Sequence, residues 1–182
     1  TVIGAGNSGR ALSAYLAQQG HCVSILTRRL NGLEKISETK SITATGRIDG
    51  TFDLAAIGIE ACKLIPSSEV IFVATVTTAY PEVARKIAPY LTKNQRVILF
   101  SGKLGGALEF SHELANAGAP SLPVLETDAL FACRAQEDES IWIRGHKQWT
   151  LFSGVSRQST LKYESLLKEF FPTLQAASNP VE

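Results

Sequence analysis

Apolar residues along the chain alternate between short continuous runs and helical spacing, an order typical of a parallel α/β protein. The first run, residues 1–3, leads through a glycine-rich turn into 10–17, where apolar residues recur every three to four positions. A second run at 21–26 follows Gly20, a residue that favours the end of a helix. These segments predict a strand, a helix and a parallel strand, which is a βαβ unit.

The same alternation continues along the chain. Residues 69–74 and 96–100 are nearly continuous apolar runs, which are typical of strands covered on both faces. A helical pattern follows each run, and we expect helices at 79–90 and 107–117. The remaining predicted elements are a helix at 31–39, strands at 122–125 and 149–152, and a last helix at 161–171.

Two hairpins are expected to interrupt this alternation. Asp49-Gly50 is a signal typical of hairpin turns, so 42–47 and 51–57 on either side of it are expected to pair as antiparallel strands. Residues 130–135 and 140–144 are expected to form the second hairpin. The pattern predicts the α/β fold class, a doubly wound parallel sheet with a small antiparallel excursion.

Composition excludes several classes of function. The 182 residues are 45% hydrophobic and carry a net charge of +1, so the chain has no overall field that attracts nucleic acid. No apolar stretch approaches the roughly 18 residues that cross a bilayer. Cys22, Cys62 and Cys133 lie far apart without a metal-binding spacing, and we expect a cytoplasmic protein without a metal.

The ends of the chain indicate a piece of a larger protein. Thr1 lies only three residues before the first glycine, and the sequence contains no methionine. Because a strand of three residues is short for the centre of a sheet, we expect the first strand to begin upstream. Residues 1–182 are expected to form one domain. Residues 179–182 show no pattern typical of the end of a protein.

The glycine-rich turn reads Gly4-Ala5-Gly6-Asn7-Ser8-Gly9, after a predicted strand and at the start of a helix. In that context the pattern predicts a Rossmann-type NAD(P)-binding turn. Gly4 permits a sharp turn, Gly6 leaves room for a diphosphate, and Gly9 lets the helix pack closely. The N–H groups at the helix start, around Asn7 and Ser8, would bind the phosphates. A compact turn without a nucleotide is the alternative.

The end of the second predicted strand indicates the kind of dinucleotide. NAD enzymes place a carboxylate there, about 20 residues after the turn. This chain instead has Thr27, Arg28 and Arg29, and no acidic residue precedes Glu34. A guanidinium pairs well with a 2′-phosphate, so NADP is preferred over NAD, with Arg28 as the first candidate and Thr27 as a hydroxyl donor. Two solvated arginines are the alternative.

A third candidate segment follows the predicted strand at 69–74. The carboxyl ends of parallel strands form the ligand crevice of a doubly wound sheet, so we expect Thr75 to face the middle of the cofactor. The hydroxyls of Thr77 and Thr78 are expected to cap the next helix.

Four segments together resemble a known family, and the last of them is much more specific than any glycine motif. They are 4–11, 87–91, 105–110 (Gly-Gly-Ala-Leu-Glu-Phe) and above all 126–134, which reads Glu-Thr-Asp-Ala-Leu-Phe-Ala-Cys-Arg. In this order they resemble the cofactor domain of the octopine and nopaline dehydrogenases, the opine dehydrogenase family. The match spans most of residues 1–140.

The resemblance implies reductive condensation of a 2-oxo acid such as pyruvate with an amino acid. The two substrates form an imine, and NAD(P)H delivers a hydride to it. The proton-transferring histidine of that family and its aspartate partner belong to a second, helical domain, which we expect downstream of Glu182. His21, His112 and His146 are therefore assigned no catalytic role, and residues 1–182 alone are expected to be inactive. The expected partners are small-molecule substrates, a 2-oxo acid and an amino acid, and neither nucleic acid nor a membrane. Whether the protein forms a homo-oligomer is left open.

The resemblance also makes Glu126 and Thr127 candidates at the nicotinamide end, where they would position its ring or a bound oxo acid. For Glu126 the alternative is a buried carboxylate paired locally, for instance with Arg134. Cys133 is expected to be a packed thiol. Lys103 has no role in the family pattern, and solvation or assistance to a phosphate or carboxylate are its alternatives.

Two other functions share these features. A related two-domain reductase, similar to ketopantoate reductase or glycerol-3-phosphate dehydrogenase, would open with the same turn and sheet. A module that senses dinucleotide without turnover would also have this fold. The segment 126–134 favours the opine dehydrogenase interpretation.

Overall fold

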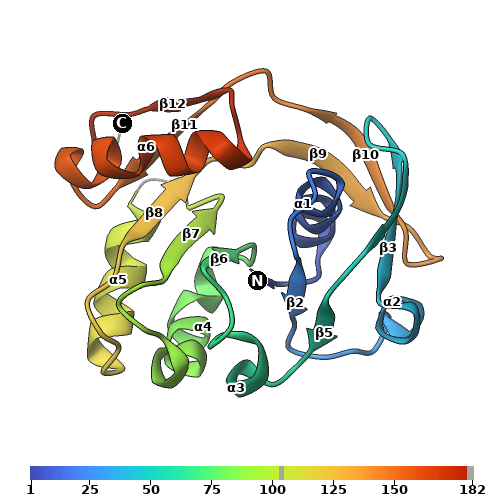
Figure 1. Ribbon diagram of the computed structural model, residues 1–182, viewed down its shortest axis with the longest axis horizontal. Coiled ribbons are helices and arrows are strands. Elements are labelled where there is room, and N and C mark those ends of the chain that lie inside the picture. The colour runs from blue at the N-terminus through green and yellow to red at the C-terminus, as the bar shows by residue number, and fades with distance from the viewer. Residues whose placement is uncertain (103–104, 180–182) are drawn as a thin grey trace.

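Figure 1 shows the computed structural model, which describes residues 1–102 and 105–179. Its main feature is a large sheet of eight strands. In chain order these are β1 (Val2–Ile3), β2 (Ser24–Leu26), β5 (Ala56–Gly58), β6 (Val70–Val73), β7 (Arg96–Phe100), β8 (Val124–Thr127), β11 (Thr150–Gly154) and β12 (Leu174–Ala176).

The strand order confirms the predicted doubly wound fold. Across the sheet the order is β12-β11-β8-β7-β6-β1-β2-β5, and the six strands from β8 to β5 are parallel. The chain moves from β1 outward through β2 to β5 and then returns to β6 on the other side of β1. In sheets of this kind ligands bind at the carboxyl edge where the order reverses, which here is between β1 and β6. β11 continues the sheet antiparallel to β8.

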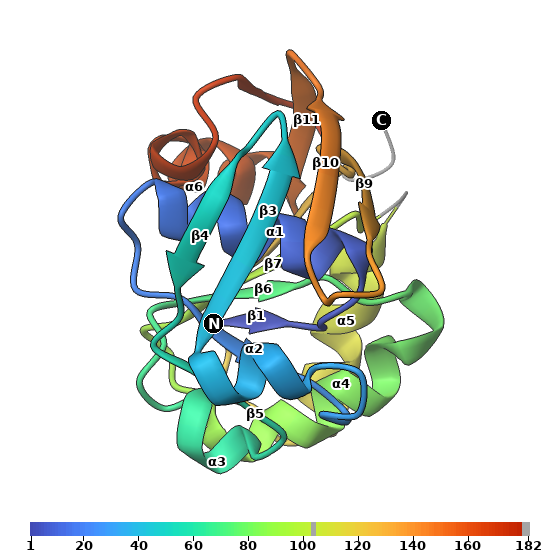
Figure 2. The same cartoon turned by 90° about the vertical axis from the view of Figure 1, so that its right-hand side faces the viewer.

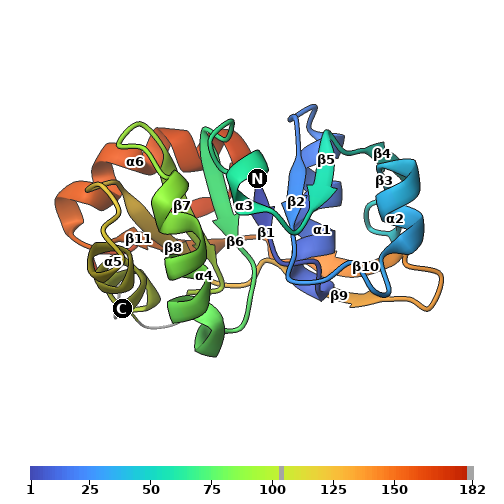
Figure 3. The same ribbon diagram turned by 90° about the horizontal axis from the view of Figure 1, so that it is seen from below.

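Helices cover both faces of the large sheet (Figures 1 and 3). The helices α3 (Ala61–Leu64), α4 (Tyr80–Ile87) and α5 (Gly106–Asn116) pack on one face. On the other face lie α1 (Asn7–Gln18) and α6 (Arg157–Phe170). Because side chains alternate along a strand, Ile71 and Val73 enter the first core and Phe72 enters the second. Within the residues described, no helix is long and apolar enough to cross a membrane.

A smaller sheet covers the outer side of α1 (Figure 2). Its strand order is β4-β3-β10-β9, with β3 (Ser41–Gly46), β4 (Gly50–Asp53), β9 (Phe131–Ala135) and β10 (Ile141–His146). The short helix α2 (Glu34–Thr39) precedes it in the chain. Covering on two sides explains why four consecutive residues of α1, 11–14, are all buried.

Both predicted hairpins are present, but they belong to the same sheet. β3 pairs with β4 and β10 with β9, both antiparallel, and β3 and β10 join the two hairpins in parallel. The prediction of one continuous strand at 51–57 was wrong. These residues are divided between β4 of the small sheet and β5 of the large one. Buried Leu54 lies at the crossing, where its N–H donates to the carbonyl of Lys40.

Other differences concern the ends of elements. The helix predicted at 79–90 is α4 with a 3-10 turn on each side, Thr77–Ala79 and Ala88–Tyr90. The expected caps at Thr77 and Thr78 were wrong, because the N-cap positions are Val76 and Ala79 and neither helix start has a side-chain cap. α3 and β12 were not predicted, since four and three residues are too short to show a period.

Candidate functional site

The glycine turn connects β1 to α1 at the carboxyl edge of the large sheet, next to the end of β6. Gly4 has a φ of +107°, and a Cβ on it would lie 2.7 Å from the carbonyl oxygen of Ala74. A Cβ on Gly9 would lie 1.9 Å from the carbonyl oxygen of Gly4. Both positions therefore require glycine for the turn and for the close approach of α1.

Gly6 differs from its neighbours, because a Cβ on it would meet no atom within 4 Å. It is exposed and is the N-cap residue of α1, and no side chain caps this helix start. The first N–H groups of a helix have no partner within the helix. The open backbone at Gly6 and the uncapped amides after it therefore fit a diphosphate.

Asn7 and Ser8 begin α1. The side-chain oxygen of Asn7 accepts a hydrogen bond from the N–H of Ala135, at 2.8 Å, and so ties α1 to β9. The side chain of Asn7 thus serves the fold, while its main-chain N–H lies at the helix start with that of Ser8.

A pocket of about 420 Å³ lies beside the turn, within the size range of ligand sites. The turn and the end of β1 form one wall, and the loop after β2 and one side of α4 form the others. Predicted residues that line it are Gly4, Gly6, Thr27, Arg28, Arg29 and Thr75. The structure thus brings together the candidates from the ends of three strands, β1, β2 and β6.

Arg28 and Arg29 are exposed at the rim of this pocket. Neither takes part in an ion pair among residues 1–102 and 105–179. Thr27 is only 8% exposed, and its hydroxyl donates to the carbonyl of Arg29 at 3.1 Å, which shapes the loop. Sequence reasoning missed Lys86, which reaches the same pocket from α4.

Thr75 provides an unusual polar group in this pocket. Its hydroxyl oxygen is buried and has no hydrogen-bond partner within the part of the chain that the structure describes. Buried hydroxyls nearly always have a partner, so this group fits a place where a ligand supplies one.

Glu126 and Thr127 lie at the end of β8 and do not line this pocket. The carboxylate of Glu126 is 6% exposed and accepts from the N–H groups of Gly105, at 3.2 Å, and Ala107, at 2.5 Å. It therefore stabilises the start of α5, which is a local pairing, but with backbone amides and not with Arg134. The hydroxyl of Thr127 donates to the carbonyl of Asp128 at 3.1 Å.

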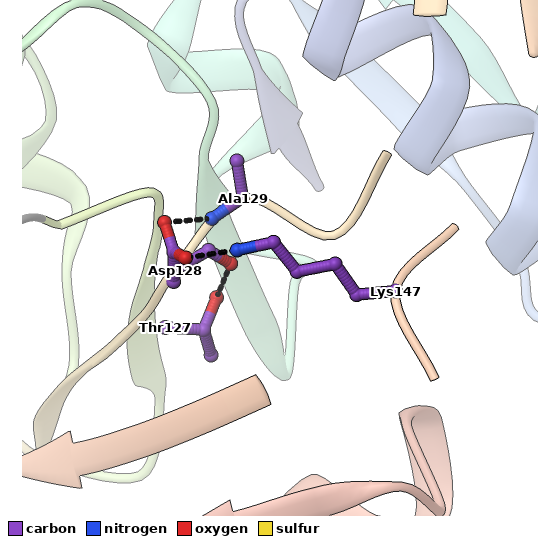
Figure 4. Close-up of polar contacts among 4 residues, drawn as sticks. All are labelled: Thr127, Asp128, Ala129 and Lys147. Atoms are coloured by element: carbon purple, nitrogen blue, oxygen red, sulfur yellow. Dashed lines mark hydrogen bonds and ion pairs between the residues drawn. The ribbon is translucent and has the colours of Figure 1, made fainter. Parts of the chain in front are cut away.

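The segment after β8 is tied to the end of β10 (Figure 4). The carboxylate of Asp128 accepts from the N–H of Ala129 and forms an ion pair with Lys147. The N–H of Lys147 donates in turn to the carbonyl of Leu130, at 2.9 Å. These contacts fix the carboxyl end of β8 against the small sheet. Lys103 lies outside the described residues.

The remaining candidates lie elsewhere. His21 packs against the ring of Phe170 with a centroid distance of 4.8 Å, and neither His112 nor His146 lines the pocket. Cys133 is half-buried, and burial raises the pKa of its thiol. Within the described ranges no three His, Cys, Asp or Glu side chains form a group that could hold a metal ion.

Comparisons with known proteins agree with this architecture. The family model "Ketopantoate reductase PanE/ApbA" matches residues 1–151. The opine dehydrogenase of Arthrobacter sp. (strain 1C) is 30% identical over 148 residues, which are 80% of this chain and 41% of that protein. Octopine dehydrogenase with NADH and pyruvate has a TM-score of 0.80 at 18% identity, over 98% of this chain and 49% of that one. Yersinopine dehydrogenase with bound NADP+ has a TM-score of 0.75 at 14% identity, over 98% and 47%.

These findings confirm the resemblance to the opine dehydrogenases and the Rossmann-type fold. They also support the related interpretation as a ketopantoate reductase-like protein. The chain spans about two fifths of the opine dehydrogenase and about half of the octopine dehydrogenase chain. Because the family model matches residues 1–151, the chain belongs to the ketopantoate reductase PanE/ApbA family of NAD(P)-dependent oxidoreductases.

Proposed function

We propose that this chain is the dinucleotide-binding part of an oxidoreductase that reduces the imine formed from a 2-oxo acid and an amino acid. The observation that carries the proposal is the open, uncapped start of α1 at Gly6 beside a pocket of about 420 Å³. The 30% sequence identity to an opine dehydrogenase supports the reduction of an imine as the reaction. The octopine dehydrogenase structure with pyruvate supports a 2-oxo acid as one substrate.

The pocket supports NADP as the preferred cofactor, with NAD as the alternative. The relatives differ in this respect, since one was solved with NADH and another with NADP+, so the proposed preference rests on the chain's own residues. Arg28, Arg29 and Lys86 line the pocket, and the loop after β2 has no carboxylate that could accept from ribose hydroxyls. A forked guanidinium contact suits a 2′-phosphate better than two hydroxyl groups.

Different residues of the site would contact different parts of the cofactor. The amides of Asn7 and Ser8 bind the diphosphate, and the loop at 27–29 binds the adenosine ribose with its phosphate. Thr75, at the end of β6, would face the middle of the cofactor. Glu126 acts indirectly, because it fixes the start of α5 and the backbone after β7, where the nicotinamide end would lie.

When bound, the nicotinamide supplies the hydride for reduction. The domain's task is to hold it in one orientation and to exclude water from the edge of the sheet. We assign no proton-transferring group to the described residues, and we propose that it lies outside this chain.

A ketopantoate reductase-like reaction is the second candidate, and the family match over residues 1–151 favours it. In that case the hydride reduces a carbonyl carbon instead of an imine carbon. The two reactions require the same cofactor site, so they differ in the acceptor alone.

The test measures NADPH oxidation by the complete natural protein that contains residues 1–182. It uses pyruvate alone, pyruvate with a panel of amino acids, and ketopantoate alone. We expect oxidation that requires both pyruvate and an amino acid. Oxidation with ketopantoate alone would support the second candidate instead. A protein that binds NADPH but oxidises it with none of these acceptors would support the dinucleotide-sensing alternative.

A further inference from the structure

We propose that Arg10 and Glu139 form a positioning clamp that holds the loop at residues 28–33 at the mouth of the pocket and thereby sets the preference for NADPH over NADH. We call this pair the Arg10–Glu139 clamp. It rests on the proposed function, because its effect is on the binding of the dinucleotide.

Arg10 joins three segments that are distant in the sequence. Its Nε donates to the carbonyl of Ala5 at 2.9 Å, within the glycine turn. Its Nη1 donates to the carbonyl of Glu139 at 2.9 Å, and its Nη2 to the carbonyl of Gly32 at 3.2 Å. Only a planar guanidinium presents donors in three such directions, and a lysine ammonium cannot reproduce this arrangement.

Glu139 holds the next part of the loop. Its two carboxylate oxygens accept from the N–H groups of Lys35, at 3.0 Å, and Ile36, at 2.9 Å, at the start of α2. Its φ is +68°, a conformation that costs a residue with a side chain about 1 kcal/mol or more. Such a conformation persists where the surroundings fix it, and here three hydrogen bonds do so.

Together the two residues fix one end of the loop that carries the arginines. At the other end, the N–H of Thr27 donates to the carbonyl of Gly58 at 2.9 Å, which binds the loop to β5. Arg28 and Arg29 lie between this bond and Gly32, so their backbone is held on both sides. Arg10 itself lines the same pocket and forms no ion pair within the described parts of the chain.

This arrangement explains why the clamp would affect one nucleotide more than the other. A forked contact between a guanidinium and a phosphate requires that the arginine backbone be held to within about 0.5 Å. NADPH makes that contact and NADH does not. A released loop therefore weakens NADPH binding selectively, whereas the diphosphate contact at Gly6 and the helix start is retained for both.

The experiment measures the dissociation constants of NADPH and NADH by nucleotide fluorescence for the complete protein and its variants. Arg10→Lys keeps the charge and removes the fork. Glu139→Gly removes the carboxylate, and glycine accepts the positive φ, so this variant is expected to fold. Glu137→Gly is the matched control, because it changes the same residue type in the same turn without removing a clamp contact.

We expect Glu139→Gly to bind NADPH about tenfold more weakly and NADH less than about threefold more weakly. Arg10→Lys also loses the bond to Ala5 in the glycine turn, so it should weaken both nucleotides, NADPH more than NADH. The control should bind both nucleotides as the wild type does. An unchanged ratio of the two constants in Glu139→Gly, with NADPH bound by the wild type, would overturn the clamp alone. A wild type that binds neither nucleotide would overturn the proposed function and the clamp with it.

Discussion

Replacing Gly6 with alanine should weaken the binding of both dinucleotides about thirtyfold and leave the fold intact. The Cβ would meet no atom within 4 Å, and the φ of −77° at this residue suits any amino acid. Alanine is a slightly poorer N-cap than glycine but restricts the unfolded chain, so the free energy of unfolding should change by less than about 1 kcal/mol.

The same methyl group would occupy the space in which the diphosphate approaches the backbone. At least one hydrogen bond between an amide and a phosphate would then be lost, which is worth about 2 kcal/mol. That loss corresponds to a dissociation constant about thirtyfold higher for NADPH and for NADH alike. The effect on both nucleotides distinguishes this variant from those of the loop after β2.

Replacing Gly9 with alanine should, unlike the change at Gly6, also destabilise the fold. A Cβ on Gly9 would lie 1.9 Å from the carbonyl oxygen of Gly4, so α1 would have to move by about 1 Å or more. We expect Gly9→Ala to reduce the free energy of unfolding by about 1–3 kcal/mol and to lose binding with it. Gly20→Ala is the control, because its φ of +86° costs stability at a site far from the pocket.

Urea unfolding and nucleotide fluorescence titrations on these three variants test the reasoning. We expect Gly6→Ala to be stable but to bind nucleotide weakly, Gly9→Ala to lose both stability and binding, and Gly20→Ala to lose stability but to bind as the wild type does. A Gly6→Ala protein that binds NADPH as tightly as the wild type would refute the assignment of the diphosphate to this turn.

Three further predictions follow from other contacts. Arg28→Ala should weaken NADPH at least about tenfold and leave NADH nearly unchanged in fluorescence titrations, with the exposed Arg157→Ala as control; equal losses would contradict an NADP site. Burial, with a smaller effect of nearby carboxylates, raises the pKa of Tyr80 to about 12, so the unfolded state loses this proton first and stability should fall from pH 10 to 12. Between pH 10 and 12 the urea midpoint of Tyr80→Phe should fall less than that of the wild type. Equal falls in the two proteins would contradict the raised pKa of Tyr80. Glu126→Gln should lower the free energy of unfolding by about 1–3 kcal/mol, because buried amides at the start of α5 lose a charged acceptor, and an unchanged urea midpoint would show that the cap is dispensable.

The local pattern was sufficient for the central parallel strands of the large sheet and for the glycine turn. The apolar runs that became β6 and β7 and the glycines before α1 depend on neighbours in the sequence, so they are readable without a structure. The division of 51–57 between two sheets could not be predicted from the sequence, because the residues on both sides of Leu54 are equally typical of a strand. A change of sheet depends on what lies opposite each strand.

The site was predictable where it follows strand ends and not where it depends on distant contacts. Arg28 and Thr75 line the same pocket, as expected because the carboxyl ends of parallel strands converge. Arg10 and Glu139 are 129 residues apart, and no spacing in the sequence indicates that they meet. The same holds for Glu126, whose carboxylate binds amides at the start of a helix that precedes it in the chain.

The similarity to both ketopantoate reductases and opine dehydrogenases is consistent with a division of labour in the protein. A cofactor that gives up a hydride has to be held in the same way whether the acceptor carbon is double-bonded to oxygen or to nitrogen. In the proposed function the turn at Gly6, the loop with Arg28 and the end of β6 at Thr75 would all contact the cofactor, and none of them would distinguish the two acceptors. Substitutions in this chain should therefore alter nucleotide affinity and NADPH preference while the choice of acceptor is unchanged, and a variant at one of these positions that exchanged the acceptor would contradict that separation.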